Sequence, residues 1–497
     1  MYKRQQQSGG LTDTQFELNP EWSNRTRNWF GVDWKLFSLK LEHEFSKRTD
    51  LSINVFGLDA ARSALGFRGL TTDLNSNPIL AVDEVDNEGN FINPRDLIVG
   101  NFQNWGVETR LLSRYQLTQK ESVFLIGAKY YKANNDARQG AGSLASDADF
   151  NFQDDVFPDY ANQSTFDFPN ENIALFGENI FNITDRFSLT PGVRFEYINT
   201  GATGIYNNVI FDNAGNPISN TEENDDQTLE RSFFLLGLGA SYKTEHNLEV
   251  YANVSENYRS VTFSDIRIVS PTFIISPTIS DERGYTADIG VRGAFKNIFT
   301  YDASIFGLWY KDRIGTIFND RAQSVRDNIG DAFIYGVENY INWDIASTFF
   351  SSKTGYLLNT FVNLAITDSE YTQSEEPIVG NKVEFIPLLN LKTGMGFGYK
   401  NILGNIQLTH LSDQFTEVTN AEQGALGSRE EGVLGKIKAY SIVDVSLSYS
   451  YKKFKLETGI NNLLNESYFT QRATGYPGPG IIPADPLSWY TTIQLRW

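Results

Sequence analysis

Arginines that fall in polar stretches are the side chains of this sequence best suited to binding a ligand. A guanidinium group donates two parallel hydrogen bonds to a carboxylate, so a group of arginines can hold an anionic molecule. The stretch 311–330 concentrates Arg313, Arg321 and Arg326. The alternative for any single arginine is an ordinary salt bridge, because aspartate and glutamate are abundant nearby. The arginines of the polar stretches are Arg62, Arg68, Arg138, Arg259, Arg267, Arg283, Arg313, Arg321, Arg326, Arg429 and Arg472.

Groups suited to catalysis are scarce. The chain has no cysteine, which excludes disulfides, thiolate metal sites and a cysteine nucleophile. His43 and His410 each fall on the apolar face of a segment in which apolar and polar residues alternate, and His246 lies in a short turn. None of the three is placed as a general base inside the molecule, so we expect no enzymatic activity.

An acidic cluster is the main candidate for a metal site. It begins with the spacing of a calcium-binding loop, but Phe152 stands where such a loop needs glycine and no glutamate follows at the required distance. We therefore expect a solvated loop and no metal site, with a weak calcium site or a cation that bridges lipopolysaccharide as the alternatives. The segments Asp83–Glu88 and Glu222–Asp226 are interpreted in the same way. The cluster consists of Asp147, Asp149, Asn151, Asp154 and Asp155.

Composition narrows the fold and the class of partner. The chain has 497 residues, and 42 basic against 61 acidic side chains give a net charge of −19, which excludes a general nucleic-acid binder. With 24 Tyr, 36 Phe, 8 Trp and 40 Gly, the sequence favours strands and turns. Its best apolar run, Phe233–Ala240, is far shorter than the roughly 20 residues of a spanning helix. The first residues contain no signal peptide.

Alternation of apolar and polar residues recurs along the whole chain. At the C-terminal end, Trp489, Ile493 and Leu495 fall on one face, while Gln494 and Arg496 fall on the other. Each alternating segment has about ten residues, the length of a tilted strand that crosses a bilayer. We identify seventeen such segments, at 32–45, 51–58, 101–117, 122–132, 172–183, 187–198, 231–243, 248–255, 284–294, 299–310, 331–343, 355–366, 383–399, 405–411, 439–450, 454–463 and 487–497.

The connections between these segments alternate strictly between short and long. Strands in an antiparallel meander reverse direction at every turn, so all long loops fall on one side and all short turns on the other. This pattern is typical of outer-membrane β-barrels, and a soluble sandwich or propeller gives no reason for it. The short connections are 46–50, 118–121, 184–186, 244–247, 295–298, 347–354, 400–404 and 451–453. The long ones are 59–100, 133–171, 199–230, 256–283, 311–330, 367–382, 412–438 and 464–486.

The terminal aromatic residue, Trp497, fixes the expected orientation and fits the signal for barrel assembly. The last strand then descends to the periplasm, and counting back, segment 32–45 descends as well. A closed single-chain barrel has an even number of strands, so at least one ascending strand is missing or weakly marked. We expect Met1 to lie inside a larger protein. The tryptophans are interpreted as an interfacial belt, near strand ends.

Several motifs follow one another along the chain, at Ala174–Ile183 with Thr190–Glu196, Val254–Phe263, Gly284–Gly293, Tyr335–Glu338, and finally Gly459–Tyr468 with Gly475–Pro483. In their order and spacing they resemble TonB-dependent outer-membrane receptors of the ferric-citrate and siderophore type, over essentially the whole chain. The closing segments carry the most specific likeness. One departure is Ala287-Asp288, which stands where Glu-Leu is usual in the family.

This resemblance implies an all-β transmembrane antiparallel barrel, with about 17–18 of an expected 22 strands in residues 1–497. A family member also carries a signal, a TonB box and a plug domain, none of which is in this sequence, so residues 1–497 are expected to be the C-terminal part of the barrel. The implied function is active uptake of an iron chelate, with no resident cofactor, across a Gram-negative outer membrane. The implied partners are the TonB complex, the chelate, outer-membrane lipid and lipopolysaccharide, and the barrel-assembly machinery.

The ligand-binding candidates under this resemblance are loop arginines, because ferric citrate and many siderophore complexes are anionic. Aromatic side chains such as Tyr131, Phe263 and Tyr476 could contact a catecholate or hydrophobic chelate. Two alternatives stay open: a receptor for another cargo such as cobalamin or an oligosaccharide, and a plugless porin or adhesin. The arginines assigned to the ligand are Arg62, Arg68, Arg313, Arg321 and Arg326.

Overall fold

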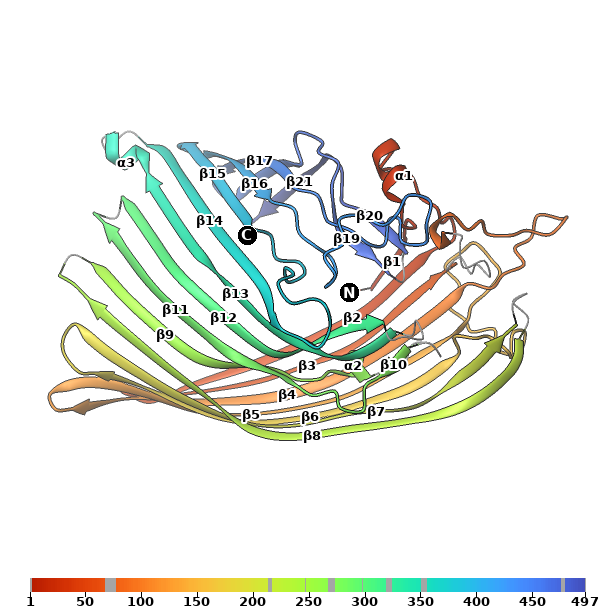
Figure 1. Ribbon diagram of the computed structural model, residues 1–497. Helices are drawn as coiled ribbons and strands as arrows, with labels where there is room; N and C mark the ends of the chain where they lie inside the picture. Colours follow the sequence, from red (N-terminus) through yellow and green to blue (C-terminus); the bar gives the residue numbers. More distant parts are fainter. Residues whose placement is uncertain are drawn as a thin grey trace.

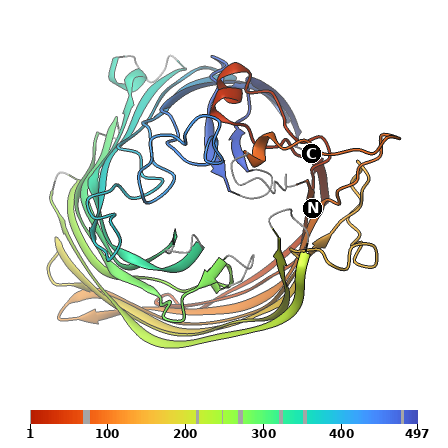
Figure 2. The same cartoon turned by 45° about the vertical axis from the view of Figure 1, so that its right-hand side comes forward.

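A single curved wall of antiparallel strands surrounds a hollow interior (Figure 1 and Figure 2). The computed structural model describes residues 2–67, 77–212, 217–245, 247–266, 273–296, 298–318, 324–349, 355–474 and 479–496. The main sheet has nineteen strands, of which β1 and β10 are short additions, leaving seventeen in the wall. Each wall strand pairs antiparallel with the next along the chain, and each corresponds to one of the seventeen segments predicted from alternation. The wall strands are β2 (Trp29–Ser46), β3 (Thr49–Gly66), β4 (Asp96–Leu117), β5 (Lys120–Ala141), β6 (Ser164–Asn182), β7 (Phe187–Phe211), β8 (Pro217–Lys243), β9 (Leu248–Arg259), β11 (Glu282–Phe295), β12 (Phe299–Phe318), β13 (Ser324–Asp344), β14 (Tyr356–Gln373), β15 (Leu389–Tyr399), β16 (Ile402–Leu411), β17 (Tyr440–Tyr451), β18 (Phe454–Asn461) and β21 (Ser488–Leu495).

Side chains along β12 illustrate how the two faces differ. Ile305 and Trp309 point outward and are 61% and 43% exposed. The opposite face carries Asp302, which accepts a hydrogen bond from the Tyr251 hydroxyl at 2.8 Å. An apolar outer band with a polar interior is the pattern of a barrel in lipid, where strand pairing must also satisfy every backbone group.

The wall strands continue well beyond the segments that alternation marked. The predicted long loop 199–230 is wrong as a loop, because β7 extends to Phe211 and β8 begins at Pro217. Loops 133–171 and 311–330 shorten for the same reason. A strand that rises above the bilayer has water on both faces, so its sequence loses the period of two although its backbone pairing continues.

Two smaller predictions are corrected. The segment 383–399 begins too early, because β15 starts at Leu389 and Phe385 has a positive φ of 60°, which ends an extended strand. Trp105 and Trp309 lie within β4 and β12 and not near their ends. Both are at a similar distance from the short-turn ends of their strands, which suits a belt at the outer edge of the apolar band.

The two edges of the wall are β21 and the short strand β1 (Tyr2–Gln6), which pairs antiparallel with β2. β1 is short and runs antiparallel to β2, so it corresponds to the ascending strand that alternation in the sequence marks only weakly. No backbone pairing joins β21 to β1 or β2 within the described ranges, so the wall is not closed there. Both termini lie on the same side of the interior in Figure 2.

Side chains bridge these two edges at the end that carries the long loops. The helix α1 (Asp13–Leu18) begins with a capping box formed by Thr12 and Gln15. It packs near the hairpin of β19 (Phe469–Ala473) and β20 (Gly480–Pro483), around an apolar cluster that includes Leu11, Ile437 and Ile481. A 3₁₀ turn, η1, covers Pro78–Leu80.

The connection between β9 and β11 folds against the inner side of the wall (Figure 1). It contains α2 (Phe263–Ile266) and β10 (Phe273–Ile275), which pairs parallel with β13. Val261 and Ile266 are buried in an apolar cluster with Phe166 and Phe168 of β6. The helix α3 (Ile345–Phe349) lies at the short-turn end. Among the residues described, no helix is long and apolar enough to cross a membrane.

Candidate functional site

A cavity of about 450 Å³ lies at the long-loop end, between β9, β11, β12 and β13. Its volume is in the range of small-molecule sites. Three arginines converge on it from different strands, and carboxylates and tyrosines surround them. The lining residues are Asn257, Tyr258, Arg259, Glu282, Tyr310, Arg313, Ile314, Arg326 and Ile334.

Asp265 of α2 holds two of the three arginines in place. Its carboxylate is 1% exposed and accepts from the Arg326 guanidinium at 2.6 and 3.2 Å. Nη2 of Arg259 contacts both oxygens of the same carboxylate at 3.2 Å. The backbone N–H and the hydroxyl of Thr262 also donate to Asp265, at 2.9 and 2.8 Å, so the carboxylate is fully enclosed by donors.

Burial alone would raise the pKa of Asp265. The hydrogen bonds from Arg326 and Thr262 outweigh burial, and the pKa of this carboxyl lies below its ordinary value. Asp265 is therefore ionised at neutral pH and keeps Arg326 and Arg259 neutralised.

Arg313 reaches the cavity because β12 is irregular at this point. The register between β12 and β13 shifts between Tyr310 and Arg313, and Asp312 has a positive φ of 56°. Such a bulge turns a side chain away from the direction that the strand would otherwise give it. The result places the Arg313 guanidinium 3.5 Å from Glu384 and 5.8 Å from the centre of the Tyr371 ring.

Arg313 is also incompletely paired. Its Nε is buried and has no hydrogen-bond partner, and the side-chain oxygen of Asn257 in the same cavity lacks one too. Unpartnered buried polar atoms are costly, and in native structures they often mark a functional site. The residues that line the cavity thus include one unmatched cationic donor and one unmatched acceptor.

The charges around the cavity are balanced overall. Arg259 donates to Glu282 at 3.0 Å, and Glu282 also accepts from the backbone of Ile314 at 2.9 Å. Each of the three arginines therefore has a carboxylate beside it, as the salt-bridge alternative in the sequence analysis expected. An anionic ligand would have to compete with these internal carboxylates.

The structure brings together two of the five arginines assigned to the ligand from the sequence, Arg313 and Arg326. Arg62 lies elsewhere, exposed on β3, with its guanidinium 6.0 Å from the centre of the Phe102 ring. Arg68, Arg321 and the assembly residue Trp497 lie outside the described residues.

The five arginines assigned to the ligand from the sequence do not include several other residues at the cavity. Arg259 belonged to the wider set of arginines, and Thr262-x-x-Asp265 has the spacing of a helix cap that could have drawn attention to Asp265. Nothing in the sequence around Glu282 or Glu384 predicts a place at the cavity, because only the folding of the barrel brings these two residues to it.

The remaining candidates occupy structural positions. His43 and His410 are on the outward face, as predicted, and His410 Nδ1 lies 2.8 Å from the Ser441 hydroxyl. His246, Tyr476 and the side chain of Phe263 lie outside the described residues. Over the described ranges, no group of three or more His, Asp or Glu side chains could hold a metal ion. In the acidic cluster, Asp154 pairs instead with Arg138.

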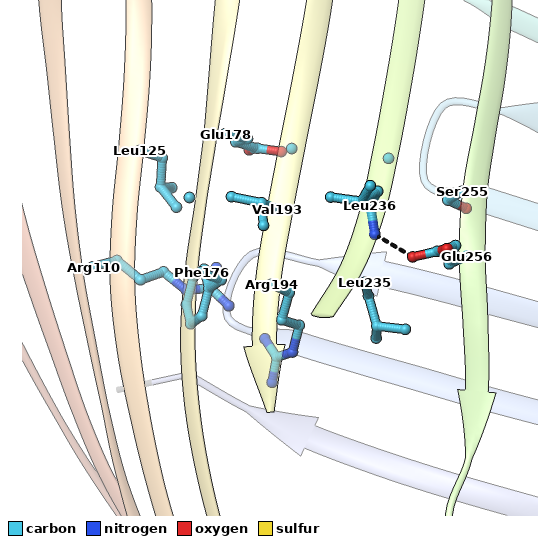
Figure 3. A pocket seen from close by; sticks show the side chains of 13 residues that line it. Arg110, Leu125, Phe176, Glu178, Val193, Arg194, Leu235, Leu236, Ser255 and Glu256 are labelled. Atoms are coloured by element: carbon cyan, nitrogen blue, oxygen red, sulfur yellow. Dashed lines mark hydrogen bonds between the residues drawn. The ribbon is translucent and has the colours of Figure 1, made fainter. Parts of the chain in front are cut away.

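A second cavity, of about 440 Å³, opens where β8 and β9 separate above Gly237 (Figure 3). There the carboxylate of Glu256 accepts from the backbone of Leu236 at 2.8 Å in place of a ladder bond. Its two arginines are already paired, Arg110 with Glu108 and Arg194 with Glu196. Side chains of both wall faces line it, so we interpret it as an opening in the wall and not as the ligand site.

The sequence matches the family described as TonB dependent receptor-like, beta-barrel, over residues 2–463. The pesticin receptor of Yersinia pestis is 25% identical over 224 residues, which are 44% of this chain and 29% of that protein. The unliganded ferric citrate transporter FecA superposes with a TM-score of 0.71 at 18% identity, covering 98% of this chain and 65% of that one. The ferric yersiniabactin uptake receptor FyuA from Yersinia pestis gives a TM-score of 0.66 at 14% identity, covering 94% and 61%.

The chain spans less than two thirds of the length of each of these relatives. At such identities the two structural matches concern the fold alone. The family match concerns most of the chain, and it agrees with the barrel, the membrane location and the receptor class predicted from the sequence. Proteins of this class are transport receptors, which is consistent with the expectation of no enzymatic activity. The chain belongs to the TonB-dependent receptor β-barrel family of the Gram-negative outer membrane.

Proposed function

We propose that this barrel belongs to a receptor that takes up an anionic iron chelate, such as ferric citrate, across the outer membrane. Uptake is energised through TonB. The chelate enters from the side of the long loops, which faces the medium in barrels of this type. No bond of the cargo is made or broken. The arginine cavity supports this cargo class, and the unpartnered Nε of Arg313 is the observation that carries it.

Binding would proceed by exchange of carboxylates. Arg313 lies 3.5 Å from Glu384, so this pair is weak enough for a ligand carboxylate to add a shorter bond to the free Nε. Arg326 and Arg259 are held more tightly by Asp265 and supply positive potential around the chelate. Arg68 and Arg321 stay candidates that extend the site, whereas Arg62 would contact only a ligand on its way in.

The experiment is ferric citrate binding to the protein expressed from its complete gene, with radioactive iron as the label. Arg313→Gln removes the charge and the free donor, and we expect about 10- to 100-fold weaker binding from a charge-assisted bond of about 1.5–3 kcal/mol. Arg292→Gln is the matched control, because Arg292 pairs with Glu249 low in the wall, away from the cavity. If the two variants bind ferric citrate with equal affinity, the cavity is not the binding site.

Energy coupling is tested separately by uptake into cells. Collapse of the proton-motive force should stop accumulation of iron inside the cell while surface binding of ferric citrate continues. Entry that persists without this energy source would favour the passive-pore alternative.

A further inference from the structure

A third cavity arises from a defect in the wall between β6 and β7. The ladder is interrupted at Phe168 and Pro169, between the pairs Asp167↔Thr203 and Asn170↔Thr200. Proline has no N–H to donate, and it therefore breaks a ladder where it occurs. Gly201 lies opposite, where an added Cβ would come within 2.9 Å of Pro169 Cγ. Because Pro169 pairs with the outward-facing Asn134, the side chain of Pro169 and the Cβ position of Gly201 face outward, and it is the backbone of these two residues that borders a hollow on the inner face.

This hollow is small and mainly neutral. Its volume is about 190 Å³. An apolar cavity of about 150 Å³ is large enough to hold benzene, so this one suits a single substituted six-membered ring. The segment Ser260–Thr262 covers it from the interior of the barrel. The lining residues are Tyr131, Ala133, Asn135, Phe168, Pro169, Asn170, Thr200, Gly201, Ser260, Val261 and Thr262.

The lining combines fixed aromatic rings with one unmatched acceptor. Phe168 is 2% exposed and its ring lies parallel to Phe166, with centroids 5.9 Å apart, so it is held rigidly. Tyr131 of β5 also lines the hollow. The side-chain oxygen of Asn135 is buried there without a hydrogen-bond partner. The Thr200 hydroxyl is already engaged, because it accepts from Asn170 at 3.0 Å.

We propose that this hollow binds an aromatic ring that carries an O–H or N–H donor, and that this donor bonds to the Asn135 oxygen. Aromatic rings stack favourably on the rings of Phe and Tyr. A sugar ring of the same size would bury several hydroxyls, and each one left unpaired costs about 1–3 kcal/mol. One free acceptor satisfies a single donor, which fits a phenol-like or aryl-amide group.

The segment that covers the hollow continues directly from the segment that lines the arginine cavity. Val261 donates to Asp281 at 2.7 Å and accepts from Arg231 at 3.1 Å, which fixes the cover to β8 and to the start of β11. Thr262 is held by Asp265, the same carboxylate that binds Arg326. The two sites therefore adjoin along the segment 257–262, which lines the arginine cavity with residues 257–259 and the hollow with residues 260–262. This inference rests on the proposed function and extends it: ferric citrate, which has no aromatic ring, would occupy the arginine cavity alone, whereas an anionic iron chelate that also carries an aromatic ring would occupy both sites.

The test uses neutral fluorinated probes and no iron, so that its failure is separate from failure of ferric citrate binding. Binding of 4-fluorophenol and of fluorobenzene to the purified protein is followed by fluorine NMR. We expect the phenol to bind about fivefold more tightly, as one neutral hydrogen bond of about 1 kcal/mol gives. Asn135→Leu should abolish this preference and leave the weaker ring binding.

Asn134→Leu is the matched control, because the neighbouring side chain is exposed on the other face of β5. It also corrects for partition of the probes into detergent. Asn135→Leu removes an unpartnered acceptor, so it should fold at least as well as the parent protein. Ala133→Leu, which fills the hollow, should remove both probes. The proposal is overturned if neither probe binds, if the preference survives Asn135→Leu, or if a fluorinated glucose binds better than the phenol.

Discussion

Arg472 shows how single residues hold the two edges of the wall together. Its side chain is 2% exposed and forms two bonds with Asp13, at 2.8 and 3.0 Å, and two more with the carbonyl of Lys436. Asp13→Asn would leave a buried guanidinium without its counter-charge, which costs about 3–5 kcal/mol. We expect the urea midpoint for unfolding to fall accordingly, measured on protein folded in detergent.

The double variant with Arg472→Met provides the check on this prediction. Replacing both partners removes the unpaired charge, so part of the lost stability should return. A double variant as unstable as the sum of the two single ones would mean that the two side chains do not act as a pair.

For single residues, the sequence predicts where arginines cluster better than it predicts which of them line the cavity. Arg313 and Arg326, which are concentrated in one stretch of the sequence, both line the cavity because they lie on the paired strands β12 and β13. Their partners Asp265 and Glu384 come from other connections, and only the paired register of the strands brings them in. Arg62 is equally polar and equally placed in a predicted loop, yet it lies on a different part of the wall.

At the scale of the elements, the position of α2 depends on charge, because Asp265 ties it to Arg326 and Arg259. The pKa of Asp265 is lowered on folding, so its contribution to stability is present above the ordinary carboxyl value and is lost as pH falls through the lower folded value. The segment 260–266 should therefore stay protected from hydrogen exchange at pH 5 to 8 and open only below about pH 4. Exchange measured by mass spectrometry across this range checks the prediction.

Asp265→Asn should open the same segment at every pH, because the amide cannot neutralise Arg326 and Arg259. Asp226→Asn is the control, since Asp226 is exposed on β8 and bonds only to Thr203 in the hydrogen bonds described for it. A wild-type opening midpoint near pH 6 would assign the transition to a group other than this carboxylate.

The strands themselves were predictable only where lipid imposes a pattern. All seventeen wall strands were found because one face of each is apolar within the bilayer. The upper parts of the longest strands, most clearly β7 and β8, are predicted as loops, because a strand with water on both faces has no reason to alternate apolar and polar residues. Proline at position 169 and glycine at 201 mark a wall defect whose consequence only the paired structure reveals.

In the molecule as a whole, the wall consists of a membrane band and a raised rim. Ile305 lies in the band, midway between the short turn at Phe299 and the belt residue Trp309, and its side chain is 61% exposed. Ile205 also points outward and is 36% exposed, but it lies high on β7 in the rim. Ile305→Lys should cost about 2–4 kcal/mol of folding free energy in a bilayer, and Ile205→Lys about 0–1 kcal/mol, because the penalty for a charge depends on depth. Urea titration of both variants in lipid vesicles measures the difference, and equal penalties would mean that the bilayer covers the rim as well.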